Sequence, residues 1–176
     1  MNAAERRQKI EQLLYHAEKP LSASTIAAAF TVSRQVIVGD IAIMRAGGLR
    51  ILATPRGYIL EQPAEGAAAC FERSLACTHD QAHMADELYT VIDYGGAVID
   101  VTVEHSVYGE ICAPLHLFSR FDIDEFRKKL ESSHARPLSA LTDGLHLHRI
   151  RCADETVFER IRNALREKGY LYEREG

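Results

Sequence analysis

The segment TDGLHLHRI, residues 142–150, places His146 and His148 two positions apart, with leucines alternating between them. Successive side chains of a β-strand point to opposite faces, so a strand here would present both imidazoles from one face. Such a pair is either the polar side of a half-buried strand or half of a metal site. The segment alone does not distinguish these interpretations, and a metal site needs further ligands from elsewhere in the chain.

A second group of candidate ligands lies near the junction of an expected strand, 70–78, with an expected helix, 80–96. His79 lies at this junction, and His83 and Glu87 are four residues apart, so they would share one helix face. If the strand with the two later histidines packs here, imidazoles and a carboxylate would meet around one divalent first-row ion. The other interpretation is that these are surface side chains, because the chain has eight histidines.

The elements that must position these residues have the pattern of an α+β domain. Strand-like stretches alternate with amphipathic helical stretches, which predicts a sandwich of a mixed sheet with helices packed on it. The expected strands are 70–78, 97–105, 110–117, 144–152 and a short last one at 170–174, and the expected helices are 80–96, 122–133 and 154–169.

The first part of the chain has a different pattern. It predicts three helices within 3–20, 21–30 and 33–48, then a hairpin over 49–60 around a TPRG turn. In the third helix we expect Ser33 as the N-cap and an inward stripe of Val36, Ile37, Ile41 and Met44. Three helices followed by a hairpin form the winged helix-turn-helix pattern, which places a helix in the DNA major groove.

The residues expected to face DNA come from the third helix and the hairpin tip. With the stripe inward, the third helix exposes Ser33, Arg34, Gln35, Val38, Ala42 and Arg45. Arginine can bind guanine at two atoms, and glutamine can do the same with adenine. Arg56 at the tip could reach a flanking phosphate or the minor groove. The alternative is a protein-interaction module, because any three-helix domain exposes polar residues on its third helix.

Composition is that of a globular chain with unevenly distributed charge. The chain has 176 residues, 47% of them hydrophobic, and a formal net charge of −4. Residues 1–63 carry eight Lys or Arg and five Asp or Glu, a net +3, whereas residues 64–176 carry thirteen and twenty, a net −7. The positive first part suits a phosphate backbone, and the overall negative charge argues against indiscriminate nucleic-acid binding.

The cysteines and the N-terminus bear on the compartment. Cys70, Cys77, Cys112 and Cys152 form no Cys-x-x-Cys pair, and we interpret them as small thiols rather than disulfides or metal thiolates. The charged N-terminus lacks a secretory apolar core, and no apolar run is long enough to span a bilayer. We therefore expect a cytoplasmic protein with no membrane partner.

Several of these stretches together resemble one known family. They are VSRQVIVGDIAIMRAGG followed by ILATPRGYIL, then the His79 to Glu87 spacing, DYGG, VEHSVYG and LTDGLHLH. Over about residues 4–172, the chain resembles the nicotinate-responsive transcriptional repressors, which join a biotin-repressor-type helix-turn-helix to a three-histidine domain. PLSALTDGLHLH and ATPRGYIL are the most specific of these stretches.

The resemblance implies a repressor of genes for NAD biosynthesis or niacin uptake, with nicotinic acid as co-repressor. It implies a homodimer on a palindromic double-stranded operator, with one divalent transition metal ion per subunit, either Ni, Zn, Fe or Mn. The family's metal ligands match His79, Glu87, His146 and His148 here. The expected domains are 1–62 for DNA binding, a linker at 63–69, and 70–176 for metal, effector and dimerisation.

Three positions depart from the family pattern. Gly39 lies inside the helix expected to read DNA, where it removes a possible contact. Ser106 stands where the family pattern has a proline, which makes that turn less rigid. His83 lies outside the pattern, and it could replace or supplement a metal ligand.

The position of an effector pocket is less evident from the sequence. His105 and Tyr108 match the family, either as a turn that holds two strands, which we favour, or as part of that pocket. A nicotinate carboxylate needs a cationic or N–H partner, and Arg120 and Arg149 are candidates, although arginines there more commonly form surface ion pairs.

Two other functions would fit parts of the same pattern. In a metal-sensing regulator the ion itself would be the signal. In a metal-dependent enzyme the ion would activate water or oxygen. We expect that the chain is not an enzyme, because four protein ligands tend to close a metal site and no separate general base is evident.

Overall fold

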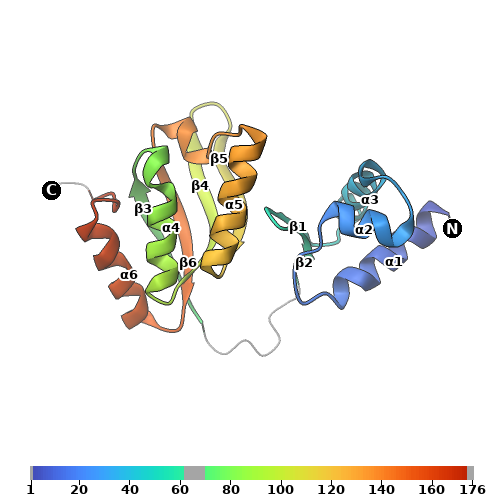
Figure 1. Cartoon of the computed structure of the whole chain (residues 1–176), viewed down its shortest axis with the longest axis horizontal. Coiled ribbons are helices and arrows are strands. Elements are labelled where there is room, and N and C mark those ends of the chain that lie inside the picture. The colour runs from blue at the N-terminus through green and yellow to red at the C-terminus, as the bar shows by residue number, and fades with distance from the viewer. Residues whose placement is uncertain (1, 62–69, 174–176) are drawn as a thin grey trace. The chain divides into compact units, whose positions relative to one another are not determined.

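The computed structural model describes residues 2–61 and 70–173. The chain divides into two compact units, Met1–Gly66 and Ala67–Gly176, each with its own hydrophobic core (Figure 1). The linker predicted at 63–69 lies outside the described residues. The helix-turn-helix followed by a sheet-and-helix unit confirms the predicted α+β class.

The first unit is a three-helix domain with a β-hairpin. Its elements are α1 (Ala3–Tyr15), α2 (Ala23–Phe30), α3 (Arg34–Ala46), β1 (Ile51–Thr54) and β2 (Gly57–Leu60). Ser22 and Ser33 cap α2 and α3, each accepting a hydrogen bond from a backbone N–H three residues later. The apolar stripes of the three helices meet in one core, to which Ile10, Leu14, Ile26, Ile37, Ile41, Met44 and Ile51 contribute.

The hairpin, or wing, is fixed to the connection between α1 and α2. Leu21 and Tyr58 exchange two backbone N–H···O hydrogen bonds, both of 2.8 Å. Gly57 has a φ of +135°, and a Cβ at this position would lie 2.3 Å from the Leu21 carbonyl oxygen. The close approach therefore requires glycine for both conformation and space.

The inward face of α3 differs from the predicted one at three positions. Val36, expected inside, is 38% exposed, while Val38, expected outside, is half-buried against the core. Asp40, not assigned to the inward stripe, is buried. The buried stripe runs through Ile37, Asp40, Ile41 and Met44, and Val36 lies about 100° around the helix from Ile37.

Asp40 is accommodated inside because arginines of α1 pair with it. Arg6 Nε lies 2.5 Å from Asp40 Oδ2, and Arg7 Nη1 lies 3.4 Å from Asp40 Oδ1. A buried carboxylate without such partners would be strongly unfavourable. The ion pairs therefore join α1 to α3.

The second unit is a four-stranded sheet with helices. Its elements are β3 (Phe71–Thr78), η1 (Gln81–His83), α4 (Met84–Asp93), β4 (Ala97–His105), β5 (Gly109–Leu117), α5 (Arg120–Ser133), η2 (Leu138–Thr142), β6 (Leu145–Cys152) and α6 (Glu155–Glu167). The strand order is β3-β6-β4-β5, and every pairing is antiparallel, so the predicted mixed sheet is wrong in this detail. In place of the last predicted strand, Leu171 makes an isolated bridge to Cys77.

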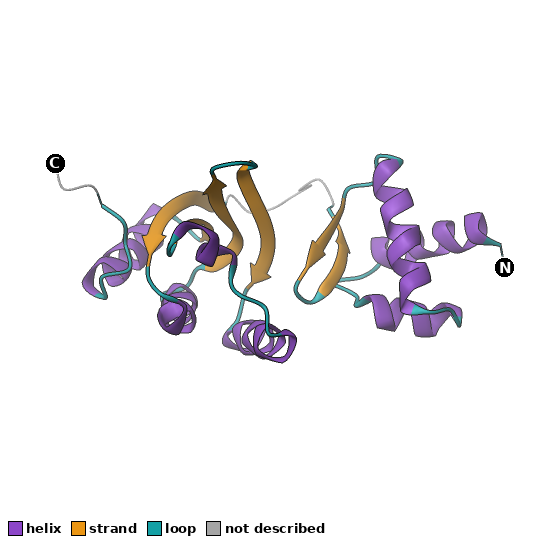
Figure 2. Cartoon of the chain, turned by 90° about the horizontal axis from the view of Figure 1, so that it is seen from above, coloured by secondary structure: helices purple, strands orange, loops and turns teal. Residues whose placement is uncertain are grey.

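The three α-helices of the second unit gather on one side of the sheet (Figure 2). Along β6, burial alternates as the sequence predicts, with His146, His148 and Ile150 buried and Leu145 and Leu147 partly exposed. The two histidines therefore point into the layer between the sheet and the helices.

Among the described residues, no single helix is both long and apolar enough to cross a membrane. The pair α2 and α3, bent by 105°, meets such a test jointly, by length and composition only.

Candidate metal centre and DNA-binding surface

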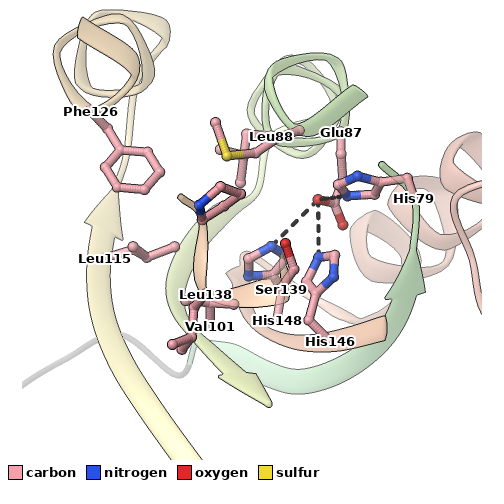
Figure 3. Close-up of a pocket in the computed structure, with 12 residues that line it drawn as sticks. His79, Glu87, Leu88, Val101, Leu115, Phe126, Leu138, Ser139, His146 and His148 are labelled. Carbon is pink, nitrogen blue, oxygen red and sulfur yellow. Dashed lines mark hydrogen bonds and ion pairs between the residues drawn. The ribbon is translucent and has the colours of Figure 1, made fainter. Parts of the chain in front are cut away.

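The four predicted ligands come together from three places in the second unit. His79 follows β3, Glu87 lies in the first turn of α4, and His146 and His148 project from β6 (Figure 3). The Nε2 atoms of His79, His146 and His148 lie 2.6, 3.3 and 3.5 Å from Glu87 Oε2. All four side chains are at most 5% exposed.

Each histidine is oriented by a backbone carbonyl. The Nδ1 atoms of His79, His146 and His148 lie 2.7, 2.8 and 2.8 Å from the carbonyl oxygens of Asp80, Gly144 and Asp100. A carbonyl oxygen only accepts hydrogen bonds, so each Nδ1 must carry the proton and donate. In the neutral ring, Nε2 is then left with a free lone pair, which is the arrangement that metal-binding histidines need.

Glu87 supplies the negative charge of the cluster. Burial alone would raise its pKa, but the imidazoles of His148, His146 and His79 hold the pKa well below its usual range. Burial alone would lower the pKa of His79 and His148, but the Glu87 carboxylate raises both above the ordinary value of 6.5. The ionised carboxylate therefore attracts cations, either protons on these rings or a metal ion.

The residues of the cluster fit a divalent ion. Glu87 Oε1 is buried and has no hydrogen-bond partner among residues 2–61 and 70–173, which is costly unless another group binds it. Ligand atoms of His79, Glu87 and His146 lie within 4.8 Å of one another, and Nε2 of His148 is only slightly farther from the shared carboxylate oxygen. Three imidazoles and a carboxylate suit Zn and its first-row neighbours.

His83 lies away from this cluster, contrary to the expectation that it shares a face with Glu87. Its side chain is 54% exposed, and Nδ1 lies 2.6 Å from Asp80 Oδ1. The reason is local, because residues 81–83 form a 3-10 turn and α4 begins only at Met84. The i to i+4 relation of an α-helix therefore does not extend back to His83.

A largely apolar pocket adjoins the cluster. His79, Glu87, His146 and His148 form one wall (Figure 3). The other walls come from α4, α5, η2 and the sheet and consist of Met84, Leu88, Val101, Leu115, Phe126, Pro137, Leu138 and Ser139. Apolar walls with a few convergent polar groups are typical of small-molecule sites.

The predicted effector residues lie elsewhere. His105 and Tyr108 belong to the turn between β4 and β5, where His105 Nδ1 accepts hydrogen bonds from the N–H groups of Val107 and Tyr108. Arg120 makes two hydrogen bonds to Asp93, of 2.7 and 2.8 Å, and Arg149 pairs with Asp100 at 2.7 Å. None of these four residues is among the described residues that line the pocket.

Sequence reasoning missed Ser139 and the apolar walls. Arg149 could not point to the metal side, because it neighbours His148 on one strand and neighbouring side chains face opposite ways. The PLSALTDGLHLH stretch, which carries part of the family resemblance, nevertheless contains the pocket residues Pro137, Leu138 and Ser139.

The residues predicted to contact DNA lie in the first unit. Arg34, Gln35 and Arg45 are exposed on α3, and Ser33 caps that helix, its Oγ lying 3.3 Å from the Val36 nitrogen. Arg56 is half-buried in the wing turn, where its backbone N–H donates a hydrogen bond to Thr54 Oγ1.

Comparison with known proteins covers both units. Residues 72–174 match the 3H domain, and residues 6–59 match an HTH domain. The chain is 40% identical over 169 residues to the "Probable transcription repressor NiaR" of Thermotoga maritima, covering 96% of this chain and 94% of that protein. It is 38% identical over 168 residues to the "Transcription repressor NadR" of Bacillus subtilis, covering 96% and 93%.

These relatives are regulators, in agreement with the expectation that the chain is not an enzyme. The HTH match agrees with a DNA-binding function for the first unit. With similarity along nearly the whole chain, the protein belongs to the NiaR/NadR family of HTH- and 3H-domain transcription repressors.

Proposed function

We propose that this repressor controls genes for NAD biosynthesis or niacin uptake, with nicotinic acid as its co-repressor and one divalent transition metal ion per subunit. It acts in the cytoplasm as a homodimer on a palindromic operator. The observation that carries the effector proposal is the direct opening of the His79, Glu87, His146 and His148 cluster onto an apolar pocket. Effector identity follows from the resemblance of the sequence to the nicotinate-responsive repressors.

The charges of the pocket explain why an anionic effector would require the metal. When the imidazoles are neutral, the Glu87 carboxylate makes the pocket wall negative, which repels a carboxylate. A divalent ion held by His79, Glu87, His146 and His148 would supply positive charge there and could bind a carboxylate or a ring nitrogen. The flat ring would then pack against Leu88, Phe126 and Leu138, with the Ser139 hydroxyl on the polar side.

The arrangement also predicts selectivity. Nicotinamide has the same ring without the negative charge, so it would gain less from the cation. Nicotinate should therefore bind more tightly than nicotinamide, and only to the metal-loaded protein.

A thermal-shift titration of the full-length protein tests this proposal. Nicotinate should raise the melting temperature in the presence of Zn or Ni, and should have little effect after chelation. The His146→Ala variant should lose bound metal and the nicotinate shift, while His83→Ala, a matched change of an exposed histidine, should retain both. An equal nicotinate shift in His146→Ala would contradict the proposal.

A metal-sensing repressor is the second candidate, because the ligand cluster is buried and complete within one unit. Fluorescence anisotropy with a DNA duplex selected by the full-length protein from a random pool distinguishes the two. Affinity that follows metal concentration without nicotinate would favour metal sensing. Affinity that requires nicotinate at saturating metal would favour the co-repressor.

A further inference from the structure

One side of the exposed surface of α3 is apolar, although a solvent-facing helix surface is normally polar. Ile43 is 56% exposed and Val36 is 38% exposed. Gly39 is exposed between them, and nothing lies within 4 Å of the position of a Cβ there. Gln35 completes the stripe, because residues 35, 39 and 43 are spaced four apart and share one side of the helix.

Stability of the first unit does not account for this composition. A glycine in the interior of an exposed helix costs about 1 kcal/mol relative to alanine. An alanine would fit at position 39 without a clash. The exposed side chains of Val36 and Ile43 likewise add little to the core. A partner that contacts this face would account for all three residues.

We propose that α3 recognises thymine C5-methyl groups in the major groove through Val36 and Ile43, while Gly39 lets the helix backbone approach the base edges closely. The methyl group of thymine is the apolar feature of that groove, and aliphatic side chains contact it. Gln35, on the same stripe, can bind the adenine of the same base pairs at two atoms. This inference rests on DNA binding by the first unit and is independent of the effector.

The charges that flank the stripe suit this occupant. Arg34 and Arg45 are exposed on α3, on the side of the stripe away from Val36 and Ile43. The first part of the chain carries a net charge of +3, unlike the rest. Phosphate contacts position a reading helix, and contacts to base edges then provide specificity. A purely apolar protein interface would not need these cations, and it is an outcome of the test below.

Replacement of thymine by uracil in the selected duplex removes only the methyl group. Each contacted methyl should contribute about four-fold to affinity, measured by fluorescence anisotropy with the full-length protein. The Val36→Ala and Ile43→Ala variants should bind the thymine duplex more weakly and lose sensitivity to uracil at one position each. Val107→Ala, which alters an exposed valine outside the DNA-binding unit, should behave as the parent protein.

The Gly39→Ala variant provides a second test, because it should move stability and affinity in opposite directions. The helix should become more stable, which raises the melting temperature, whereas the added methyl should weaken DNA binding. If the fold itself required Gly39, the Gly39→Ala substitution would lower both the melting temperature and the DNA affinity.

Two results would overturn the inference: uracil substitution without effect at every position, or Gly39→Ala binding that matches the parent. If nicotinate still controlled DNA affinity in the same experiment, only the thymine contact would be wrong and the proposed function would stand. If Val36→Ala and Ile43→Ala altered self-association instead of DNA affinity, the face would be a protein interface.

Discussion

At the scale of single residues, three histidines of the second unit already have the orientation that metal ligands need. Three backbone carbonyls hold the Nδ1 protons, so the three Nε2 atoms point at one carboxylate oxygen. Such support reduces the freedom that binding would otherwise remove. The centre therefore depends on backbone geometry as much as on the four side chains.

Glu87→Gln tests the charge at this centre with almost no change of shape. The amide binds a cation more weakly, so we expect metal affinity to fall by at least about ten-fold, without loss of the fold. Elemental analysis after gel filtration and circular dichroism measure the two effects. Glu104→Gln, a change of an exposed glutamate on β4, is the control, and full metal occupancy in Glu87→Gln would exclude Glu87 as a ligand.

Metal affinity should depend on pH in a direction set by Glu87. In the metal-free protein the carboxylate raises the pKa of His79 and His148 above 6.5, so these rings retain protons at higher pH than free histidine does. A metal ion must displace those protons. As the pH is lowered, metal affinity should therefore start to fall while the pH is still above 6.5, and it should continue to fall at lower pH.

Isothermal titration calorimetry in buffers of different ionisation enthalpy measures both the affinity and the number of protons released. Uniform affinity from acidic to neutral pH, with no proton release, would contradict this assignment.

At the scale of elements, two close backbone approaches position the functional parts. Gly57 lets the wing meet the residues before α2, as described above. Gly144 has a φ of +95°, and a Cβ there would lie 2.3 Å from the His79 carbonyl oxygen. The Gly144 carbonyl also accepts the His146 hydrogen bond. This glycine therefore brings the end of β3 and the start of β6 together at the candidate metal centre.

Gly144→Ala and Gly109→Ala make a matched pair. Gly109 also has a positive φ, +73°, but nothing lies within 4 Å of its Cβ position. Its replacement should cost about 1 kcal/mol of unfolding free energy from backbone strain alone. Gly144→Ala should cost more than about 2 kcal/mol, because strain and a backbone clash add, and it should also lower metal occupancy.

Chemical denaturation and elemental analysis on both variants measure these effects. Equal destabilisation, or unchanged metal content in Gly144→Ala, would show that the close approach to His79 has no role in the metal centre.

At the scale of the whole molecule, the proposed function assigns DNA binding and effector binding to different units. A ligand of the second unit can change DNA affinity only if it binds the DNA-competent arrangement of the dimer more tightly than the alternative. In the proposed dimer, two recognition helices would have to match half-sites about one helical turn, or a multiple of it, apart. Under the proposed function, regulation is thus a property of the complete chain and of the proposed dimer.

Thermodynamic linkage makes this coupling measurable from both sides. If nicotinate tightens DNA binding by some factor, commonly about 5- to 150-fold in allosteric proteins, DNA must tighten nicotinate binding by the same factor. Calorimetric titration of nicotinate into the metal-loaded protein, with and without the selected duplex, tests this equality. Identical nicotinate affinity in both titrations would mean that nicotinate is not the signal.

The sequence by itself determined most of the elements. Helix caps such as Ser22 and Ser33, the alternation along β6 and the apolar stripes are local patterns, and local backbone preferences decide them. The sequence also contained the four candidate ligands. Their assignment as one set came from the family resemblance, since residue spacing left the surface interpretation open.

Only the tertiary structure decided which of these side chains meet. The pairing of Cys77 with His146 in neighbouring strands brings residues almost seventy positions apart together, and no local pattern encodes such a register. Tertiary packing also left Val36 exposed and placed the pocket at η2, away from Arg120 and Arg149. The physical reason is that local periodicity decides which face of its own helix or strand a side chain occupies. Burial of apolar surface in a shared core decides which faces of other elements pack against it.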